Sequence, residues 1–138
     1  MMQKIKRILL VDDNEDDNWY HERIIKKNDS ATKVIALESG LDALALLKEE
    51  STSDIAHPEL ILLDINMPGM NGWEFLEEYK KIDHKGKRSI VVIMLTTSDN
   101  PDDLEKAHRI DILSDIKTKP LTNDMLNDII AKYFSEKL

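Results

Sequence analysis

The sequence of 138 residues contains no cysteine. Disulfide bonds, zinc sites built from thiolates and cysteine nucleophiles are therefore excluded. The absence of cysteine also fits a reducing compartment, so we expect the protein to work in the cytoplasm.

Long apolar runs are also missing. Lys4, Lys6 and Arg7 precede only a short apolar run at residues 8–11, whereas the core of a secretory signal peptide needs about 7–15 apolar residues. No run anywhere in the chain approaches the ~20 apolar residues that a helix needs to span a bilayer. The sequence therefore predicts a soluble protein with neither a signal peptide nor a membrane span.

Positive charge is scarce relative to negative charge. There are 19 lysines and arginines against 27 aspartates and glutamates, which gives a formal net charge of −8. Nucleic acid and anionic membranes would be repelled on average, so we expect neither as a direct partner. A divalent cation, or a cationic patch on another protein, suits this charge balance better.

The few histidines and tryptophans carry no strong functional signal. His21, His57, His84 and His108 lack the spacing of metal ligands, so we expect all four at the surface. Trp19 and Trp73 lie near the starts of expected helices, where partial burial is the expected use of these side chains.

Five short apolar runs alternate with amphipathic segments along the whole chain. Unbroken apolar strands are typical of a parallel sheet that helices cover on both faces. Right-handed crossovers then give an α/β fold, a (βα)5 doubly wound parallel sheet. No internal repeat is present, and we expect one domain over residues 1–138 with no second domain after the last helix. The expected strands lie at residues 8–11, 34–37, 60–63, 90–95 and 112–116.

The expected helices begin at recognisable caps. Asn71 and Glu74 have the spacing of a capping box. Thr122 precedes an apolar stripe at helical spacing and is the expected N-cap of the last helix. Asn100 and Pro101 have the order of an N-cap and a first helical residue. The first helix is expected over residues 15–27.

Polar side chains follow the ends of the expected strands. Asp12 and Asp13 follow the first strand, Asp64 the third, Thr96 the fourth and Lys119 the fifth. Ligands of open α/β sheets bind at this carboxyl edge. Clustered carboxylates repel one another unless a cation joins them, and an oxygen-rich site with few protein ligands suits Mg²⁺.

The same set of residues suits phosphoryl transfer. An aspartate can act as a nucleophile and form an aspartyl-phosphate. The charge on the equatorial oxygens must then be neutralised. Mg²⁺, the ammonium of Lys119 and the hydroxyl of Thr96 would supply that neutralisation.

Four motifs lie along the chain: Val-Asp-Asp-Asn at residues 11–14, Leu-Leu-Asp-Ile-Asn-Met-Pro-Gly-Met-Asn-Gly at 62–72, Leu-Thr-Thr-Ser at 95–98 and Lys-Pro at 119–120. Together they resemble a CheY-like response-regulator receiver domain along essentially the whole chain. The resemblance implies a flavodoxin-like sheet with strand order 2-1-3-4-5 and a stand-alone regulator of a two-component or phosphorelay system. The phosphodonor would be a sensor histidine kinase or a histidine phosphotransfer protein.

The resemblance also assigns roles around the metal. Asp64 would be the phosphoacceptor. Asp13 and Asp64 would ligate Mg²⁺ directly together with the backbone carbonyl of Asn66, and Asp12 would act mainly through metal-bound water. Lys119 would pair with Asp64 before phosphorylation and with the phosphoryl oxygens afterwards.

Activation and output follow from the same resemblance. Thr96 would move inward to bond a phosphoryl oxygen, and the surface of the fourth helix, fifth strand and fifth helix would change its protein contacts. The domain would promote its own phosphorylation and dephosphorylation. Asn66 and Ser98 stand at the positions where the family tunes the rate of dephosphorylation. The bond between Lys119 and Pro120 would be cis. Whether the fourth-helix face forms a homodimer stays open.

Two features set this sequence apart within the resemblance. Ile116 stands where the family usually has a tyrosine or phenylalanine, so switching through a rotating ring is not expected. A polar loop at residues 51–58 and the motif at 95–98 are similar to stand-alone receivers that work with phytochrome-type kinases.

Three other functions compete with this interpretation. A phosphatase of the haloacid dehalogenase type would need Asp-x-Asp after its first strand, but Asp12 and Asp13 are adjacent. A flavin-binding electron carrier would need a phosphate cradle at the same place, where these two carboxylates would repel a phosphate. An interaction module that works without phosphorylation is the main alternative. Metal-dependent acceptance of phosphate separates it from the switch.

Overall fold

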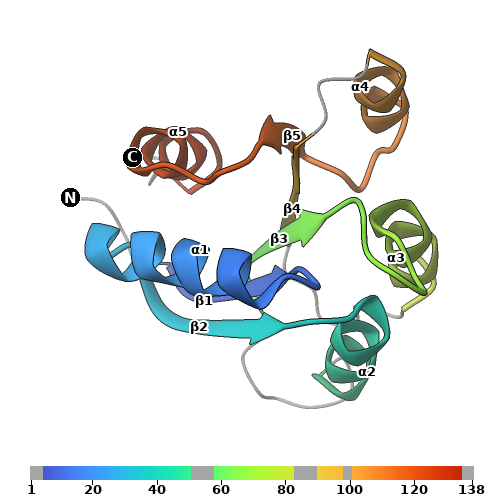
Figure 1. Cartoon of the computed structure of the whole chain (residues 1–138), viewed down its shortest axis with the longest axis horizontal. Helices are drawn as coiled ribbons and strands as arrows, with labels where there is room; N and C mark the ends of the chain where they lie inside the picture. The colour runs from blue at the N-terminus through green and yellow to red at the C-terminus, as the bar shows by residue number, and fades with distance from the viewer. Residues whose placement is uncertain (1–4, 51–57, 83–89, 98–100, 135–138) are drawn as a thin grey trace.

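A computed structural model gives the structure of the chain and describes residues 5–50, 58–82, 90–97 and 101–134 (Figure 1). Strands and helices alternate, as the sequence predicts. The strands are β1 (Ile5–Val11), β2 (Ala31–Leu37), β3 (Leu60–Asp64), β4 (Val91–Thr96) and β5 (Asp115–Thr118). The helices are α1 (Glu15–Asn28), α2 (Gly40–Glu50), α3 (Gly72–Tyr79), α4 (Pro101–His108) and α5 (Asn123–Tyr133).

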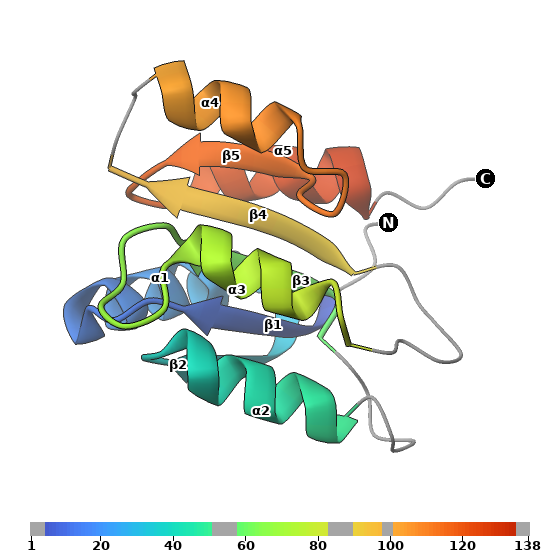
Figure 2. The same cartoon turned by 90° about the vertical axis from the view of Figure 1, so that its right-hand side faces the viewer.

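The strands form one parallel sheet in the order β2-β1-β3-β4-β5. Figures 1 and 2 show α1 and α5 on one face of this sheet and α2, α3 and α4 on the other. In the register of the central strands, Leu10 pairs with Leu62 and Leu62 with Ile93. The predicted flavodoxin-like order is therefore confirmed.

The two faces bury separate apolar clusters. Alternate side chains of a strand point to opposite faces, so an unbroken apolar strand feeds both clusters. In β3, Leu60 and Leu62 contribute to the cluster under α1 and α5, while Ile61 and Leu63 contribute to the cluster under the other three helices. Burial on both faces explains why β3 carries no polar residue before Asp64.

The predicted caps are present where the structure describes them. The Asn71 side chain accepts a hydrogen bond from the Glu74 backbone N–H, and the Glu74 side chain accepts one from the Asn71 backbone N–H, which completes a capping box. The Thr122 hydroxyl oxygen accepts a hydrogen bond from the Met125 backbone N–H. α4 begins at Pro101 as predicted, but its expected cap, Asn100, lies outside the described residues.

The fifth strand differs from its predicted position. It runs over Asp115–Thr118 rather than residues 112–116. Leu113 is buried in the core, but it belongs to a turn before the strand. Its backbone N–H donates to the Ile110 carbonyl, and pairing with β4 begins only at Ser114, whose N–H donates to the Val92 carbonyl. The apolar run therefore marks core burial rather than the strand itself.

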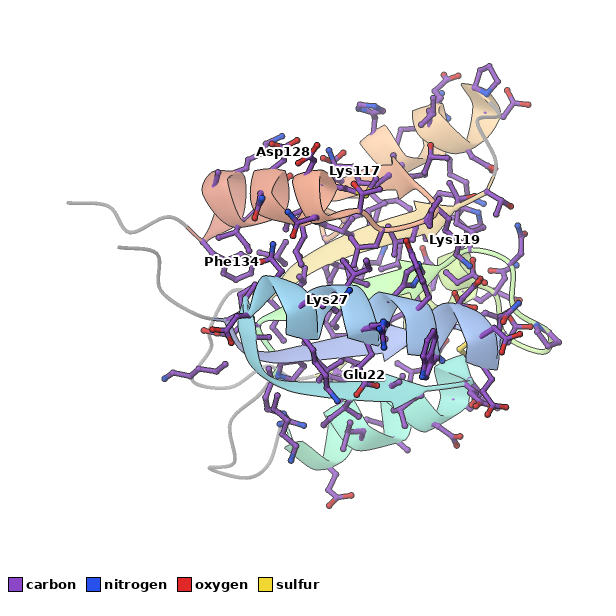
Figure 3. All side chains as sticks on the ribbon, turned by 60° about the vertical axis from the view of Figure 1, so that its left-hand side comes forward. Glu22, Lys27, Lys117, Lys119, Asp128 and Phe134 are labelled. Carbon is purple, nitrogen blue, oxygen red and sulfur yellow. The ribbon has the colours of Figure 1, made fainter. Side chains whose placement is uncertain are left out.

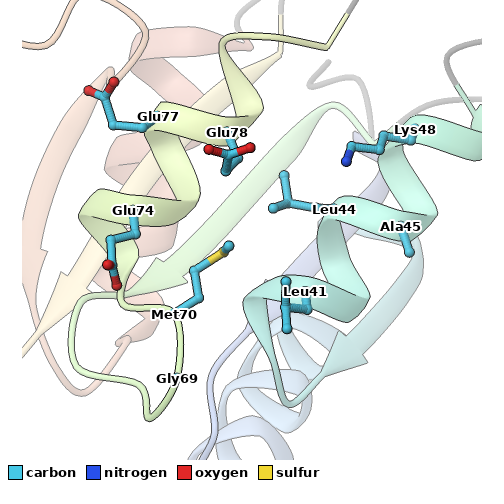
Figure 4. A pocket seen from close by; sticks show the side chains of 9 residues that line it. All are labelled: Leu41, Leu44, Ala45, Lys48, Gly69, Met70, Glu74, Glu77 and Glu78. Carbon is cyan, nitrogen blue, oxygen red and sulfur yellow. The ribbon is translucent and has the colours of Figure 1, made fainter.

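A groove of about 470 Å³ separates α2 and α3 (Figure 4). Leu41 on its rim is 64% exposed, whereas Leu44, one helical turn further on, is buried. Met70 from the loop before α3 contacts the groove, and its side chain lies against Gly40. Over the described ranges, no helix has both the length and the apolar character that crossing a bilayer requires.

Candidate functional site

The carboxyl edge of the sheet brings the predicted residues together. Asp64 ends β3 and Thr96 ends β4, while Asp12 follows β1 directly. In the register, Asp64 pairs with Leu95, and Thr96 pairs with Thr118, the residue before Lys119. Parallel pairing thus turns residues far apart in the sequence into neighbours.

Three carboxylates form the centre of the site. Asp12, Asp13 and Asp64 each offer an oxygen, and these oxygens all lie within 4.8 Å of one another. Asp12 and Asp64 are buried, whereas Asp13 is exposed. Hard oxygen ligands on a site that is open on one side fit Mg²⁺, which keeps several of its waters. The donor set therefore fits the predicted metal.

The Lys119 ammonium faces the carboxylates. Its Nζ lies 2.6 Å from Asp12 Oδ2 and 3.3 Å from Asp64 Oδ1. The backbone N–H of Lys119 donates to the Thr96 carbonyl at 2.7 Å, which fixes the end of β5 against β4. Figure 3 shows Lys119 over the N-terminal half of α1, with Lys27 toward the other end of that helix.

Burial and charge shift the protonation of both partners. Burial and the neighbouring Asp12 charge raise the pKa of Asp64 to about 6, although Lys119 acts in the opposite direction. Burial alone would lower the pKa of Lys119, but hydrogen bonds to Asp12 and Asp17 outweigh it and raise that pKa above its ordinary value. A bound cation would oppose the rise at Asp64, because it favours the carboxylate.

Asp12 is held from several sides. Its Oδ1 accepts the backbone N–H of Asn14 at 2.9 Å, while its Oδ2 accepts from Lys119. The side-chain amide of Asn18 donates to the Asp12 backbone carbonyl at 2.8 Å. These bonds fix the position of a buried carboxylate before any ligand arrives.

The loop after Asp64 depends on a close backbone approach. A Cβ added to Gly72 would lie 2.7 Å from the Asp64 carbonyl oxygen and 3.0 Å from Ile65 Cα. The Gly72 N–H donates to the Ile65 carbonyl at 2.8 Å. Only glycine allows α3 to start this close to Asp64. Asn66, the predicted carbonyl ligand, is an exposed residue of this loop.

The remaining predicted residues have mixed outcomes. The Lys119–Pro120 bond is cis, as predicted. Thr96 is buried at the strand end. Ile116 is partly buried and packs against the cluster under α2, α3 and α4. Ser98 and the loop at residues 51–57 lie outside the described residues.

Helix α1 contributes polar residues that the sequence patterns did not assign to the site. Asp17 Oδ2 accepts a hydrogen bond from Lys119 Nζ at 2.9 Å. Asn18 and His21 are both buried. Asn18, His21 and Ile25 recur at helical spacing on one buried face, so periodicity alone could have placed His21 inside.

The prediction of four surface histidines is wrong for His21. It is only 3% exposed because it lies on the inner face of α1. Burial, followed by the nearby charge of Lys119, lowers its pKa. His108 is exposed as predicted, and His57 and His84 lie outside the described residues. The prediction for Trp19 is also wrong, since this side chain is 63% exposed, with Arg23 stacked over its ring.

Comparison with known proteins assigns the chain to a family. The sequence model of the response regulator receiver domain matches residues 8–131. Response regulator Rcp1 of Synechocystis is 34% identical over 108 residues, which are 78% of this chain and 72% of that protein. Sporulation initiation phosphotransferase F of Bacillus subtilis is 30% identical over 135 residues, 96% of each chain.

Solved structures agree with the fold. A two-component response regulator from Cytophaga hutchinsonii superimposes with a TM-score of 0.86 at 33% identity, over 94% of this chain and 97% of that one. The bacteriophytochrome response regulator AtBRR gives a TM-score of 0.77 at 27% identity, over 99% and 97% of the two chains.

Proposed function

The chain belongs to the response regulator receiver domain family, and we propose that it is a phosphorylation switch whose phosphoacceptor is Asp64. The observation that carries the proposal is the position of the Lys119 ammonium, 3.3 Å from Asp64 and 2.6 Å from Asp12. A cation so close to a buried carboxylate cluster suits charge neutralisation during phosphoryl transfer.

The metal of this proposal is Mg²⁺. Asp13, Asp64 and the backbone carbonyl of Asn66 would hold it directly, and Asp12 would act mainly through metal-bound water. The mutual approach of Asp12, Asp13 and Asp64 to within 4.8 Å supports this set. When bound, Mg²⁺ neutralises charge on the phosphoryl oxygens and favours the ionised form of Asp64.

In the proposed reaction, a carboxylate oxygen of Asp64 attacks the phosphorus of a phosphohistidine on the partner. The new P–O bond forms as the P–N bond breaks, and the imidazole leaves with the electron pair and takes up a proton. Lys119 donates to a phosphoryl oxygen, and the Thr96 hydroxyl donates to another. The domain thereby promotes its own phosphorylation and, with water as nucleophile, its own dephosphorylation.

The signal would leave through the surface of α4, β5 and α5. Thr96 and Lys119 connect the site to this surface, since the Lys119 backbone N–H bonds the Thr96 carbonyl at the end of β5. Ile116 offers an aliphatic side chain there, so the change is expected to be a shift of strand and helix packing without ring rotation. A downstream protein, or a second copy of the chain, would bind this face.

The partner that delivers the phosphoryl group is proposed to be a sensor histidine kinase or a histidine phosphotransfer protein in the cytoplasm. The likeness to the bacteriophytochrome response regulator AtBRR favours a kinase of the phytochrome type. The likeness to the sporulation phosphotransferase of Bacillus subtilis supports the other candidate partner, a histidine phosphotransfer protein in a phosphorelay.

The proposal is tested by incubating the protein with Mg²⁺ and acetyl phosphate and measuring the intact mass. We expect one phosphate adduct on the wild type, none without Mg²⁺ and none on Asp64→Asn. Asp115→Asn is the matched control, because Asp115 is a partly buried aspartate that pairs with Lys117 away from the cluster, and it should keep the adduct.

The same measurement exposes the alternative. If wild-type protein binds Mg²⁺ but gains no phosphate from acetyl phosphate or from a cognate kinase, the chain is an interaction module that works without phosphorylation. An adduct that persists on Asp64→Asn would assign the phosphoacceptor to another residue.

A further inference from the structure

Lys119 has a third carboxylate partner that the proposed mechanism does not use. Asp17, in the first turn of α1, accepts a hydrogen bond from Lys119 Nζ at 2.9 Å. This distance is shorter than the 3.3 Å between Lys119 and Asp64. The ammonium is therefore drawn toward α1 as well as toward the phosphoacceptor.

An ammonium has three N–H donors. Three carboxylates, of Asp12, Asp17 and Asp64, already lie within 3.3 Å of Lys119 Nζ. The Lys119 side chain is only 9% exposed, so water offers few alternative partners. A phosphoryl oxygen that needs an N–H of Lys119 must consequently displace one of these three contacts.

Of the two shorter contacts, Asp17 is given up more easily than Asp12. Its side chain is 38% exposed, against 6% for Asp12, so water can solvate it once Lys119 leaves. Asp12 is also fixed by the Asn14 backbone N–H. The Asp17 backbone, meanwhile, is held by the Asn14 side chain, which caps the helix at 3.1 Å. The Asp17 carboxylate thus starts from a fixed helix turn and pulls on Lys119 from a defined direction.

We propose that Asp17 is a positioning residue that restrains Lys119 in the unphosphorylated protein and so slows phosphoryl acceptance at Asp64. This inference rests on the proposed function. In this proposal Asp17 would contact neither the phosphoryl group nor the metal. It acts by competing for an N–H donor of Lys119, and neutralising it frees that donor for the phosphoryl oxygen.

The test compares phosphorylation rates of the wild type, Asp17→Asn and Asp16→Asn with acetyl phosphate at saturating Mg²⁺. In each case acetate leaves as the phosphoryl group joins Asp64. Asp16 is the matched control, because it is an exposed aspartate of the same helix turn and lies outside the Lys119 contacts. Both variants remove one negative charge, so any general effect on an anionic donor is shared.

We expect Asp17→Asn to raise the maximal rate at saturating donor by about three- to tenfold, and Asp16→Asn to change it less than about twofold. The donor concentration at half-maximal rate should change little in either variant. In a Lys119→Ala background the effect of Asp17→Asn should vanish, since Asp17 acts only through that lysine. A purely structural role of Asp17 would instead slow the reaction.

A second measurement reads Lys119 directly. The ¹⁵N resonance of its ammonium, recorded with Mg²⁺ and no phosphodonor, should shift in Asp17→Asn but stay in place in Asp16→Asn. An unshifted resonance, or equal rates in the two variants, overturns the inference while the proposed function stands. A wild-type protein that accepts no phosphate overturns both.

Discussion

The two faces of the sheet meet the carboxyl edge with different chemistry. On one face the first turns of α1 bring Asp17, Asn18 and His21 against the edge, and all three are polar. On the other face Gly40 and Gly72 begin α2 and α3 with close backbone packing against Met70 and Asp64. Helix α1 therefore places polar and charged side chains beside the site, whereas close packing at the starts of α2 and α3 fixes the backbone there.

Within the helices that the structure describes, the buried polar residues Asn18 and His21 both lie on α1. A buried polar side chain is tolerated when it has partners. The amide of Asn18 bonds the Asp12 carbonyl, and the carboxylate of Asp17 bonds Lys119. The cluster under α2, α3 and α4 consists of apolar side chains, with Phe75 stacked on Tyr79. We therefore expect substitutions under α2, α3 and α4 to act through packing, and substitutions beside α1 to act through charge.

The largest expected effect is on stability, at α2. Leu44→Ala should lower the free energy of unfolding by about 2–4 kcal/mol, because Leu44 is buried and its removal leaves a cavity. Leu41→Ala, on the exposed side of the same helix, should change it by less than about 0.5 kcal/mol. Urea denaturation measures both. Neither variant should alter the rate of phosphorylation per folded molecule, and a changed rate would refute the division of roles between the faces.

An intermediate effect is expected at the edge itself. Between about pH 4 and 6 the folded protein keeps a proton on Asp64 that the unfolded chain releases, so stability falls as pH rises through this window. Asp64→Asn should remove that loss and stabilise the metal-free protein by about 1–2 kcal/mol at pH 7, allowing for solvent screening. The gain should fade toward pH 4, as urea denaturation in the presence of a chelator would report. A gain that is constant with pH would contradict the raised pKa of Asp64 as its cause.

The smallest effect is expected at His21 and runs in the opposite direction with pH. Its lowered pKa means that the unfolded chain takes up a proton more readily, so stability is fully present above about pH 6.5 and falls as the solution becomes more acidic. The charges that face it are Lys119, Asp12 and Asp17. Against an Asp64→Asn background, which removes the opposing trend, His21→Gln should flatten stability between pH 5 and 7. An unchanged slope would show that His21 is not desolvated.

Much of the fold could be predicted from local patterns. The apolar run at residues 60–63 predicted β3 because a strand covered on both faces must be apolar throughout, and the caps at Asn71 and Thr122 satisfied local backbone groups. The fifth strand was misplaced because Leu113 is buried from a turn. An edge strand needs fewer apolar residues, and β5 accordingly has only partly buried or exposed ones.

The candidate site divides in the same way. The order of residues along the chain was enough to predict which side chains follow the strands. Parallel strands must end at one edge, and this brought Asp12, Asp13, Asp64, Thr96 and Lys119 together. The choice of partners for Lys119, in contrast, depends on how the helices pack.

Asp17 and Lys119 are 102 residues apart in the sequence, and no spacing rule connects them. Their contact depends on how α1 lies across the sheet, which the packing of Ile25 and its neighbours against the strands fixes. The burial of His21 has the same origin. Local patterns determine what each element contains, but the charge that one element presents to another is set by the angle and depth at which they pack.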